Sequence, residues 1–377
     1  MRAPVRGAPL ARASEKATLD GAFGTDNVEP ELDGSAPNQH EPGKLLDRRA
    51  RPLLDLRVSV TDRCNFRCRY CMPREHFASG HRFLPRSEIL DFEEITRVVA
   101  ALAPLGLRKV RLTGGEPLLR SELPKLVERL AEIPKLDLAL TTNAVLLKNH
   151  ARALKAAGLG RLTVSLDALG ADAFRAMADA DYTADDVLEG IAAAEAAGFS
   201  RLRVNTVVRR GVNDEEILAL ARKFRNTGHV VRFIEYMDVG STNGWLRSQV
   251  FSADEIVARI GAEFPLEPLS PSAQGEVARR FRYLDGAGEI GVVASVTAPF
   301  CGDCTRLRLS ADGKLYTCLF ASNGHDLRPV LRNADATDDD VRRFVAGVWR
   351  ERDDRYSEQR ALVPLRLRRV EMSFIGG

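Results

Sequence analysis

Six short runs of β-branched and other apolar residues constrain the fold of this chain, because helical segments of matching size separate them. Strands that alternate with helices form βαβ units, in which the strands lie parallel in one sheet and the helices cover it. Six strands are too few to close an eight-stranded barrel. The pattern therefore predicts an α/β fold with an open partial (β/α)6 TIM-like barrel, in preference to a doubly wound sheet. The expected strands are residues 55–61, 109–115, 137–143, 161–167, 201–208 and 230–237.

Each helical segment carries one apolar stripe. Residues 91–102 place apolar side chains at helical spacing, and Asp91 can act as their N-cap. Residues 123–130 and 187–191 repeat this spacing. After residue 240 the rhythm changes to one helix, residues 252–264, and to short strands separated by turns.

We therefore expect three regions along the chain. Residues 1–50 form a disordered N-terminal extension, because they are polar and lack helical or strand periodicity. Residues 51–240 form the partial barrel, and residues 241–377 form a smaller C-terminal α/β domain.

Charge and hydropathy narrow the functional classes. The 377 residues include 55 basic and 52 acidic ones, for a net charge of +3, which gives no bulk attraction to nucleic acid or to a membrane. No run of eighteen apolar residues suggests a transmembrane helix. The N-terminus is basic but lacks the apolar segment of a secretory signal, and an extension is favoured over an organelle transit peptide. We expect a cytoplasmic protein.

Residues that commonly serve function gather where the expected strands end. Three cysteines follow the first strand, TGGEP ends the second, TTN ends the third, and Ser165 and Asp167 lie near the end of the fourth. In barrels of this type, functional residues collect at the carboxyl ends of the strands. We therefore expect the functional site at that face.

Cys64, Cys68 and Cys71 follow the pattern C-x3-C-x2-C. A 4Fe–4S cluster is normally held by four thiolates, so three thiolates leave one iron open to a small molecule. A zinc site completed by His76 and a disulfide with one free thiol are the alternatives. Six cysteines in 377 residues are too few for a disulfide scaffold, which favours metal or redox chemistry.

Cys301, Cys304 and Cys318 form a second group of three, in the C-terminal domain. This group again indicates a cluster with one open iron. A zinc ribbon completed by His325 is the alternative.

Arg306 and Arg308 alternate in an expected strand beside the second cysteine group, so both side chains lie on one face. Two guanidiniums there suit bidentate recognition of a polyphosphate. A solvated strand face is the alternative.

An aromatic residue, Tyr70, precedes the last cysteine of the first group, and residues 113–119 read TGGEPLL. Both elements resemble the radical S-adenosylmethionine superfamily. In that superfamily the open iron chelates the amino and carboxylate groups of S-adenosylmethionine, and reductive cleavage gives a 5′-deoxyadenosyl radical. The glycine pair suits close approach of the backbone to a ligand, and a tight strand-to-helix turn is the alternative.

From Leu54 to the C-terminus the chain resembles one family more closely, the GTP 3′,8-cyclases of molybdenum cofactor biosynthesis. The motifs that carry this resemblance are LRVSVTDRCNFRCRYCMP, RLTGGEPLLR, VSLDAL, RFIEYMDVG, FCGDCTRLRLSADGKLYTCL and the terminal FIGG. The resemblance implies abstraction of the ribose 3′ hydrogen of GTP by the radical and formation of a bond between C3′ and C8. The implied product is 3′,8-cyclo-7,8-dihydro-GTP.

The same resemblance implies roles for individual residues. Two 4Fe–4S clusters would be held by Cys64, Cys68 and Cys71 and by Cys301, Cys304 and Cys318. S-adenosylmethionine would contact Tyr70, Gly115, Ser165 and Met237. GTP would contact Arg57, Arg111, Thr142, Arg203, Arg306 and Arg308. The residues with implied catalytic roles are Arg306, Arg308 and the tail glycines Gly376 and Gly377, for which a frayed terminus is the alternative.

The sequence leaves two other functions open. A peptide-modifying radical S-adenosylmethionine enzyme with an auxiliary cluster would typically carry more cysteines in its C-terminal region than the three present here. A zinc-stabilised binding protein would leave TGGEP and the strand-end arginines unexplained. The resemblance is compatible with a homodimer and with hand-off of an unstable product to a cyclic pyranopterin monophosphate synthase.

Overall fold

The structure is a computed structural model that describes residues 44–78, 80–360, 362 and 369–376. The predictions for residues 1–43 and for Gly377 lie outside the described residues.

The six expected barrel strands are present, with bounds within a few residues of those predicted. Neighbours in the chain pair with each other in parallel register, as βαβ units require. The strands are β1 (Asp55–Ser59), β2 (Lys109–Thr113), β3 (Asp137–Thr142), β4 (Arg161–Ser165), β5 (Arg203–Val208) and β6 (Val230–Glu235).

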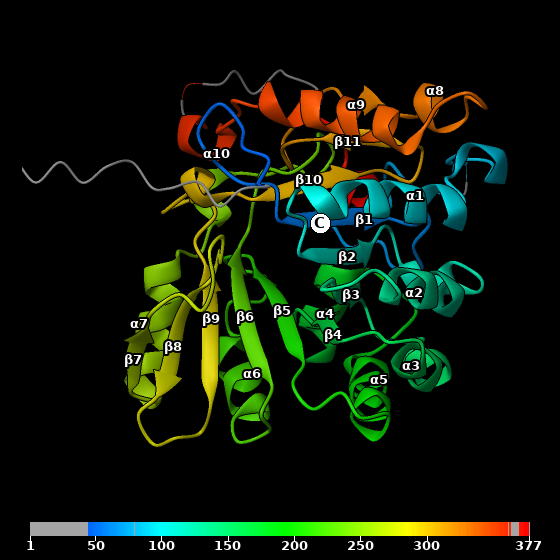
Figure 1. Cartoon of the computed structure of the whole chain (residues 1–377). Coiled ribbons are helices and arrows are strands. Elements are labelled where there is room, and N and C mark those ends of the chain that lie inside the picture. The colour runs from blue at the N-terminus through cyan, green and yellow to red at the C-terminus, as the bar shows by residue number, and fades with distance from the viewer. Residues whose placement is uncertain (1–43, 79, 361, 363–368, 377) are drawn as a thin grey trace, which may run out of the picture. The chain divides into compact units, whose positions relative to one another are not determined.

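The strands after residue 240 extend the same sheet at both edges instead of forming a sheet of their own. They are β7 (Leu266–Leu269), β8 (Arg279–Tyr283), β9 (Glu289–Val293), β10 (Arg306–Leu309), β11 (Lys314–Tyr316) and β12 (His325–Asp326). Parallel pairing joins β9 to β6 and β10 to β1. Among the described residues this gives one sheet of 12 strands, in the order β12-β11-β10-β1-β2-β3-β4-β5-β6-β9-β8-β7 (Figure 1). A six-stranded open sheet would leave unpaired backbone groups at both edges, and the added strands satisfy them.

Helices pack on the outer side of the curved sheet, as Figure 1 shows for α2, α3, α5 and α6. The helices are α1 (Phe92–Leu102), α2 (Leu123–Ala131), α3 (Leu147–Ala156), α4 (Ala171–Ala178), α5 (Ala184–Ala196), α6 (Glu216–Phe224), α7 (Ala253–Glu263), α8 (Arg328–Leu331), α9 (Asp338–Arg350), α10 (Tyr356–Gln359) and α11 (Met372–Ile375). No helix in the described part of the chain is long and apolar enough to span a membrane.

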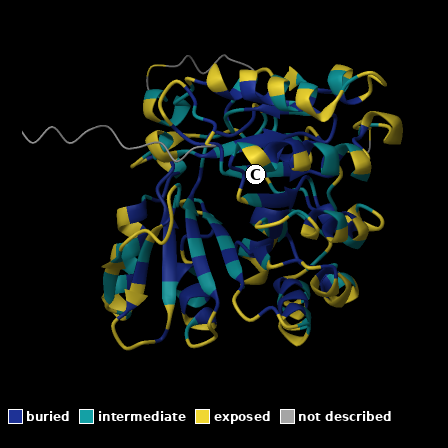
Figure 2. Cartoon of the chain, in the orientation of Figure 1, coloured by how far each residue is buried: buried dark blue, intermediate teal, exposed yellow. Residues whose placement is uncertain are grey.

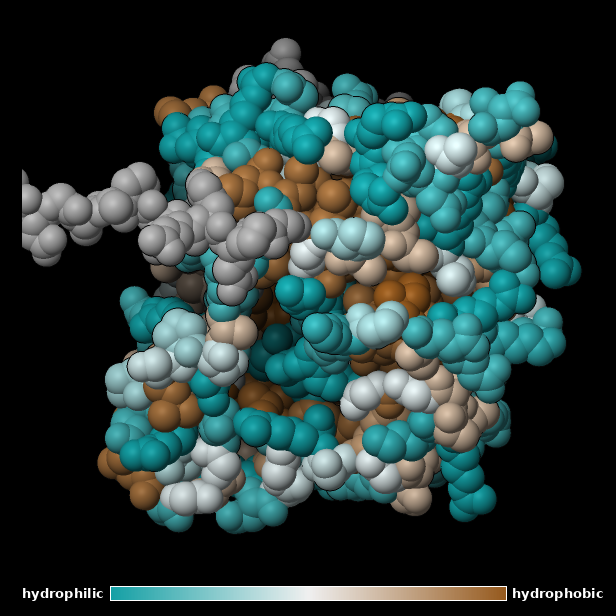
Figure 3. Space-filling model, viewed as in Figure 1, coloured by the Kyte–Doolittle hydropathy of each residue, from teal (hydrophilic) through white to brown (hydrophobic). Residues whose placement is uncertain are grey.

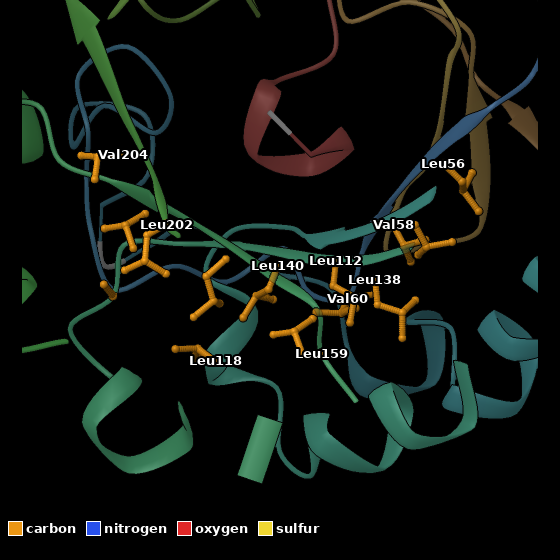
Figure 4. Packing of buried hydrophobic residues seen from close by; sticks show 14 of the residues in the cluster. Leu56, Val58, Val60, Leu112, Leu118, Leu138, Leu140, Leu159, Leu202 and Val204 are labelled. Atoms are coloured by element: carbon orange, nitrogen blue, oxygen red, sulfur yellow. The ribbon is translucent and has the colours of Figure 1, made fainter. Parts of the chain in front are cut away.

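The hydrophobic core lies between the strands and these outer helices. Leu56, Val58, Leu112 and Leu140 are buried strand residues of this core, and Figure 4 shows them beside the helices. Burial follows the strands, while the outward helix faces are exposed (Figure 2). The short helix α11 lies on the opposite, concave side of the sheet (Figure 4). The concave side is therefore free of the main core and available for a site.

The folded region begins before residue 50, where we expected the extension to end. Leu45 and Asp47 are buried, and the Leu45 amide donates to the Leu105 carbonyl at 3.0 Å. Leu46 also forms a β-bridge with Pro52. Residues 44–50 are thus part of the packed structure.

The predicted N-cap of α1 is confirmed as a full capping box. The Asp91 side chain accepts from the Glu94 amide at 2.7 Å, and the Glu94 side chain accepts from the Asp91 amide at 2.8 Å. Both bonds satisfy amides that the helix itself leaves without partners. The apolar stripe predicted for this helix is buried at Ile95, Val98 and Val99.

Replacement of this cap tests how much it stabilises the fold. Asp91→Ala should lower the free energy of unfolding by about 1 kcal/mol, the usual contribution of an N-cap. Chemical denaturation of the purified protein measures this difference. Glu128→Ala is the matched control, since Glu128 is exposed within α2 and caps nothing. A loss in the control equal to that in Asp91→Ala would contradict the assignment of the cap.

Candidate functional site

One cavity on the concave side of the sheet brings together both cysteine groups. Its volume is about 270 Å³, and all six cysteines line it. Figure 3 shows a hollow near the centre of this view, with hydrophilic residues inside it. The predicted site residues that line the cavity besides the cysteines are Arg57, Tyr70, Arg111, Gly115, Thr142, Ser165, Met237, Arg306 and Arg308.

The first cysteine group lies in the loop that follows β1. The Cys71 and Met72 amides donate to the Cys68 carbonyl at 2.9 and 2.8 Å, which closes a tight turn around the group. Phe66 anchors this loop against Phe174 by an edge-to-face contact, with ring centroids 6.1 Å apart. Burial raises the pKa of the Cys64 thiol to about 12. Three half-buried thiols on one turn are a donor set suited to a cluster.

The two glycines of TGGEP allow this cysteine loop to approach β2. A Cβ on Gly115 would lie 2.1 Å from the Arg63 carbonyl oxygen, and one on Gly114 would lie 2.4 Å from the Thr61 carbonyl oxygen. The Gly115 amide donates to that Thr61 oxygen at 2.9 Å. The glycines are therefore required by loop-to-loop packing, in addition to any approach to a ligand.

The buried carboxylate of Glu116 links the residues that follow β2 to the carboxyl end of β3. The Glu116 side chain accepts from the Thr142 hydroxyl and from the Asn143 amide, both at 2.8 Å. Burial raises the pKa of Glu116 to about 7. Thr142, expected to contact GTP, lines the cavity, but its hydroxyl hydrogen is donated to Glu116.

Tyr70 is held by a second buried carboxylate. Its hydroxyl donates to Asp167 Oδ2 at 2.8 Å, and Asp167 Oδ1 accepts from the Val207 amide at 2.8 Å. Burial raises the pKa of Asp167 to about 6. Asp167 thus links the cysteine loop after β1 to strands β4 and β5.

Three arginines stand side by side across three strands. Strand pairing places Arg57 of β1 opposite Arg111 of β2 on one side and Arg308 of β10 on the other. Burial and the charges of Arg308 and Arg306 hold the pKa of Arg57 well below its usual range. Like charges directly opposite each other destabilise a sheet. Such a row therefore indicates a place where an anion binds.

The arginines of this row contact hydroxyl groups and leave some nitrogen atoms without partners. Arg111 Nη1 donates to the Thr141 and Thr163 hydroxyls at 2.9 and 2.8 Å. The Nε atoms of Arg57 and Arg111 are buried without a hydrogen-bond partner among the described residues. Asp55, two residues before Arg57 on β1, forms an ion pair with Lys109 at 3.2 Å.

Three arginines that line the cavity were not predicted from the sequence, namely Arg51, Arg232 and Arg352. Arg232 of β6 lines the cavity and donates to Asn205 Oδ1 at 3.0 to 3.1 Å. Burial lowers the pKa of Arg232 to about 9. Arg203 is absent from the described residues that line the cavity. Alternation along β6 could have identified Arg232, because it shares a strand face with Ile234 of the cavity wall.

The second cysteine group lies around the β10–β11 hairpin. Cys301 and Cys304 come just before β10, and Cys318 just after β11, so antiparallel pairing brings them to one end. Burial acts to raise the pKa of Cys304, but Arg306 and Arg352 outweigh it and lower the pKa to about 6. Cationic surroundings of this kind favour thiolates, the form that binds iron.

The two cysteine groups lie at opposite ends of paired strands. The first group follows the carboxyl end of β1, whereas Cys304 precedes the amino end of β10, which runs parallel to β1. At about 3.3 Å per residue, their separation along the strands is on the order of 15 Å. The arginine row lies between them. Within the described residues, no three His, Cys, Asp or Glu side chains converge as the ligands of one metal ion would.

The C-terminal tail reaches the arginine row. Arg308 Nη1 donates to the Gly376 carbonyl oxygen and, at 3.4 Å, to the Ile375 carbonyl oxygen. Gly376 has φ of +74°, and a Cβ there would lie 2.4 Å from Thr113 Cγ2. Side chains of Glu371 and Arg369 fix the tail to the segment after β6. Their partners are the Ser241 amide, the Thr242 hydroxyl and the Asp238 carboxylate.

Comparisons with known proteins agree with this geometry. The model of the Radical SAM superfamily matches residues 58–224, and that of Molybdenum Cofactor Synthesis C matches residues 229–358. A GTP 3′,8-cyclase of Acidothermus cellulolyticus is 55% identical over 358 residues, 88% of this chain and 99% of the relative. A GTP 3′,8-cyclase of Staphylococcus epidermidis is 46% identical over 338 residues, with 88% and 99% covered.

Solved structures support the fold. The crystal structure of Streptococcus suis SuiB bound to S-adenosylmethionine aligns with a TM-score of 0.56 at 13% identity, and covers 76% of this chain and 65% of SuiB. This likeness concerns the fold alone. Since full-length relatives share about half of the residues and both family models match, the chain belongs to the GTP 3′,8-cyclase family of radical S-adenosylmethionine enzymes.

Proposed function

We propose that this protein converts GTP to 3′,8-cyclo-7,8-dihydro-GTP, the first step of molybdenum cofactor biosynthesis, in the cavity between the two cysteine groups. The observation that carries the proposal is that both groups line one cavity with a row of buried arginines between them. A substrate that contacts both cysteine groups and the arginine row must combine an anionic part, for the arginines, with a part that can reach the second cysteine group. GTP has both, in its triphosphate and its guanine base.

The first cysteine group would hold a 4Fe–4S cluster that, together with S-adenosylmethionine, supplies the 5′-deoxyadenosyl radical. Tyr70, Gly115, Ser165 and Met237 line the cavity on this side and would contact S-adenosylmethionine. Asp167 fixes the Tyr70 ring by accepting a hydrogen bond from the Tyr70 hydroxyl. The chain's contribution here is orientation, because the cofactors carry the difficult chemistry.

The arginine row would bind the triphosphate. Arg57, Arg111 and Arg308 present adjacent guanidiniums that the protein leaves largely without carboxylates. Guanidiniums bind phosphate oxygens with two parallel hydrogen bonds. Arg232 adds a further buried cation on β6. Fixed phosphates would hold the ribose at one place in the cavity, which is what a reaction between C3′ and C8 requires.

The second cysteine group would hold another 4Fe–4S cluster, whose open iron would meet the guanine base. Arg306 lies between Cys304 and the arginine row. Its guanidinium stands 5.3 Å from the centre of the Phe300 ring. Arg306 would therefore bridge the base-binding and phosphate-binding parts of the cavity.

Anaerobic reconstitution tests the proposal directly. The protein is loaded with iron and sulfide and incubated with S-adenosylmethionine, a strong reductant and GTP. We expect equal amounts of 5′-deoxyadenosine and cyclised guanosine triphosphate. Formation of 5′-deoxyadenosine without a cyclised product from any nucleotide would retain the superfamily and overturn the substrate.

Removal of single guanidiniums should impair turnover without loss of the first cluster. Arg306→Ala and Arg308→Ala should each lower kcat/KM for GTP by roughly 10- to 100-fold, because a hydrogen bond to a charged group contributes about 1.5–3 kcal/mol. Steady-state kinetics and iron content measure the two effects. Arg282→Ala is the matched control, since Arg282 is exposed on β8 and pairs with Glu267. Loss of the first cluster in both cavity variants would count against a substrate role.

A methyl group at Gly376 should displace the tail. The added Cβ meets Thr113 Cγ2 in a backbone conformation that L-residues rarely adopt. Gly376→Ala should therefore move the carbonyl oxygen that Arg308 contacts and reduce kcat/KM by about 10- to 100-fold. Gly347→Ala in α9 is the control, because a Cβ there meets no atom within 4 Å. Equal activity of the two variants would show that the tail plays no part in turnover.

A further inference from the structure

A buried network joins the first described segment of the chain to the second cysteine group. Asp47 Oδ2 accepts from Arg51 Nε at 2.6 Å and from Arg352 Nη1 at 3.4 Å. All three side chains are almost completely buried. Arg51 precedes β1 and Arg352 follows α9, so the network holds together two segments some 300 residues apart in sequence.

Both arginines of the network donate to the backbone of the cysteines. Arg51 Nη1 donates to the Cys301 carbonyl oxygen at 2.8 Å, and Arg352 Nη1 donates to the Cys304 carbonyl oxygen at 2.7 Å. The Arg352 guanidinium also stacks over Trp349, 4.5 Å from its ring centre. Two guanidiniums are thus fixed directly behind the two cysteines that precede β10.

The charges around these cysteines do not cancel. The guanidiniums of Arg51, Arg306 and Arg352 face three carboxylates, those of Asp47, Asp354 and Asp55, and Asp55 is shared with the Lys109 ammonium. Asp47 is fully buried, but the side chain of Asp354, which accepts from Arg352 Nε at 3.3 Å, is 28% exposed and so screened by water. Arg51 Nη2 is buried without a hydrogen-bond partner among the described residues. The surroundings therefore carry an excess of positive charge.

Such an excess has no evident benefit for folding alone. Burial of an unbalanced guanidinium costs free energy, and apolar residues of similar volume often serve as well. Positive charge beside metal-bound thiolates instead favours the electron-rich state of a cluster, because reduction adds one negative charge there. Groups behind the ligands are known to tune metal sites in this way.

We propose that the Asp47–Arg51–Arg352 network sets the reduction potential of the cluster held by Cys301, Cys304 and Cys318, and raises it by placing positive charge at the backbone of Cys301 and Cys304. This inference rests on the proposed function, since it needs a cluster at the second group. The three residues act through the cysteines and are positioning residues. In the proposed reaction, a raised potential would favour the reduced form of this cluster, supplied by the external reductant. The reduced cluster would pass one electron to the radical that remains after the C3′–C8 bond has formed, and this radical would take up a proton to give the closed-shell product.

The test is a redox titration of the reconstituted holoenzyme without substrate, followed by electron paramagnetic resonance. The signal of the second cluster is identified as the one that Cys301→Ala abolishes. Arg352→Met removes a positive charge and should disfavour reduction at least tenfold, which lowers the midpoint potential by about 59 mV for one electron. Asp47→Asn removes a negative charge and should shift the potential in the opposite direction. Arg352→Lys, which retains the charge, should stay close to the wild type.

Controls separate this effect from general damage. Arg350→Met changes an exposed arginine at the end of α9, two residues before Arg352, and should leave the potential unchanged. A purely structural network would give shifts of one sign in Arg352→Met and Asp47→Asn, or none, and either result overturns the inference. If those two variants fail to assemble the cluster, Arg51→Gln decides, because it removes a charge while keeping a donor near the Cys301 carbonyl. An unchanged potential in Arg51→Gln would also overturn it.

Iron content distinguishes a failure of the proposed function, which requires the second cluster, from a failure of this inference. The wild-type holoenzyme should contain roughly eight iron atoms per chain, as two 4Fe–4S clusters require. A content of about four, with no signal that depends on Cys301, would refute the second cluster itself. An iron content of about eight, with a midpoint potential that does not change when Asp47 or Arg352 is replaced, would refute only the role of the network.

Discussion

The parallel pairing of β10 with β1 is the constraint on which the candidate site depends. It aligns Arg308 with Arg57, and Arg57 is in turn aligned with Arg111 on β2. Because the two strands run in the same direction, the cysteines before β10 and those after β1 are held at opposite ends of one short sheet segment. A shift of β10 by one residue would turn Arg306 and Arg308 to the opposite face of the sheet, away from Arg57. The same pairing thus fixes both the cation row and the distance that a substrate must span.

Buried charge distinguishes this cavity from the rest of the fold. The outer surface pairs arginines with carboxylates, as Arg222 does with Glu263 and Arg210 with Glu255. Inside the cavity, Arg57 and Arg111 retain buried nitrogen atoms without partners among the described residues. Burial of cations without anions is unfavourable unless a ligand supplies the missing charge. The contact of Arg308 with the Gly376 carbonyl is consistent with this reasoning, since a neutral oxygen satisfies the donor without neutralising the charge.

The barrel could be predicted from the sequence because its signals are local. Strand runs, apolar stripes and the Asp91 cap all depend on residues near each other in the chain, and the structure confirms them. The C-terminal strands were expected in a smaller domain, but they extend the barrel sheet at both edges. This could not be predicted, because the sequences of short strands such as β9 and β10 do not indicate which edge each strand pairs with. The same holds for site residues. Arg232 and Glu116 take their places from strand neighbours, and Arg203 is absent from the cavity lining although its residue type suits the role.

Both ends of the described chain contact the site. Asp47 and Arg51 support the second cysteine group, while Gly376 closes on the arginine row. The cavity is therefore complete only when the first and the last described segments have both docked, so it forms late in a chain that folds from its N-terminus. For a radical enzyme this order is useful, because a highly reactive radical formed in an incomplete cavity would react with water-exposed groups nearby. Dependence on both the first and the last described segments links radical chemistry to the fully folded state.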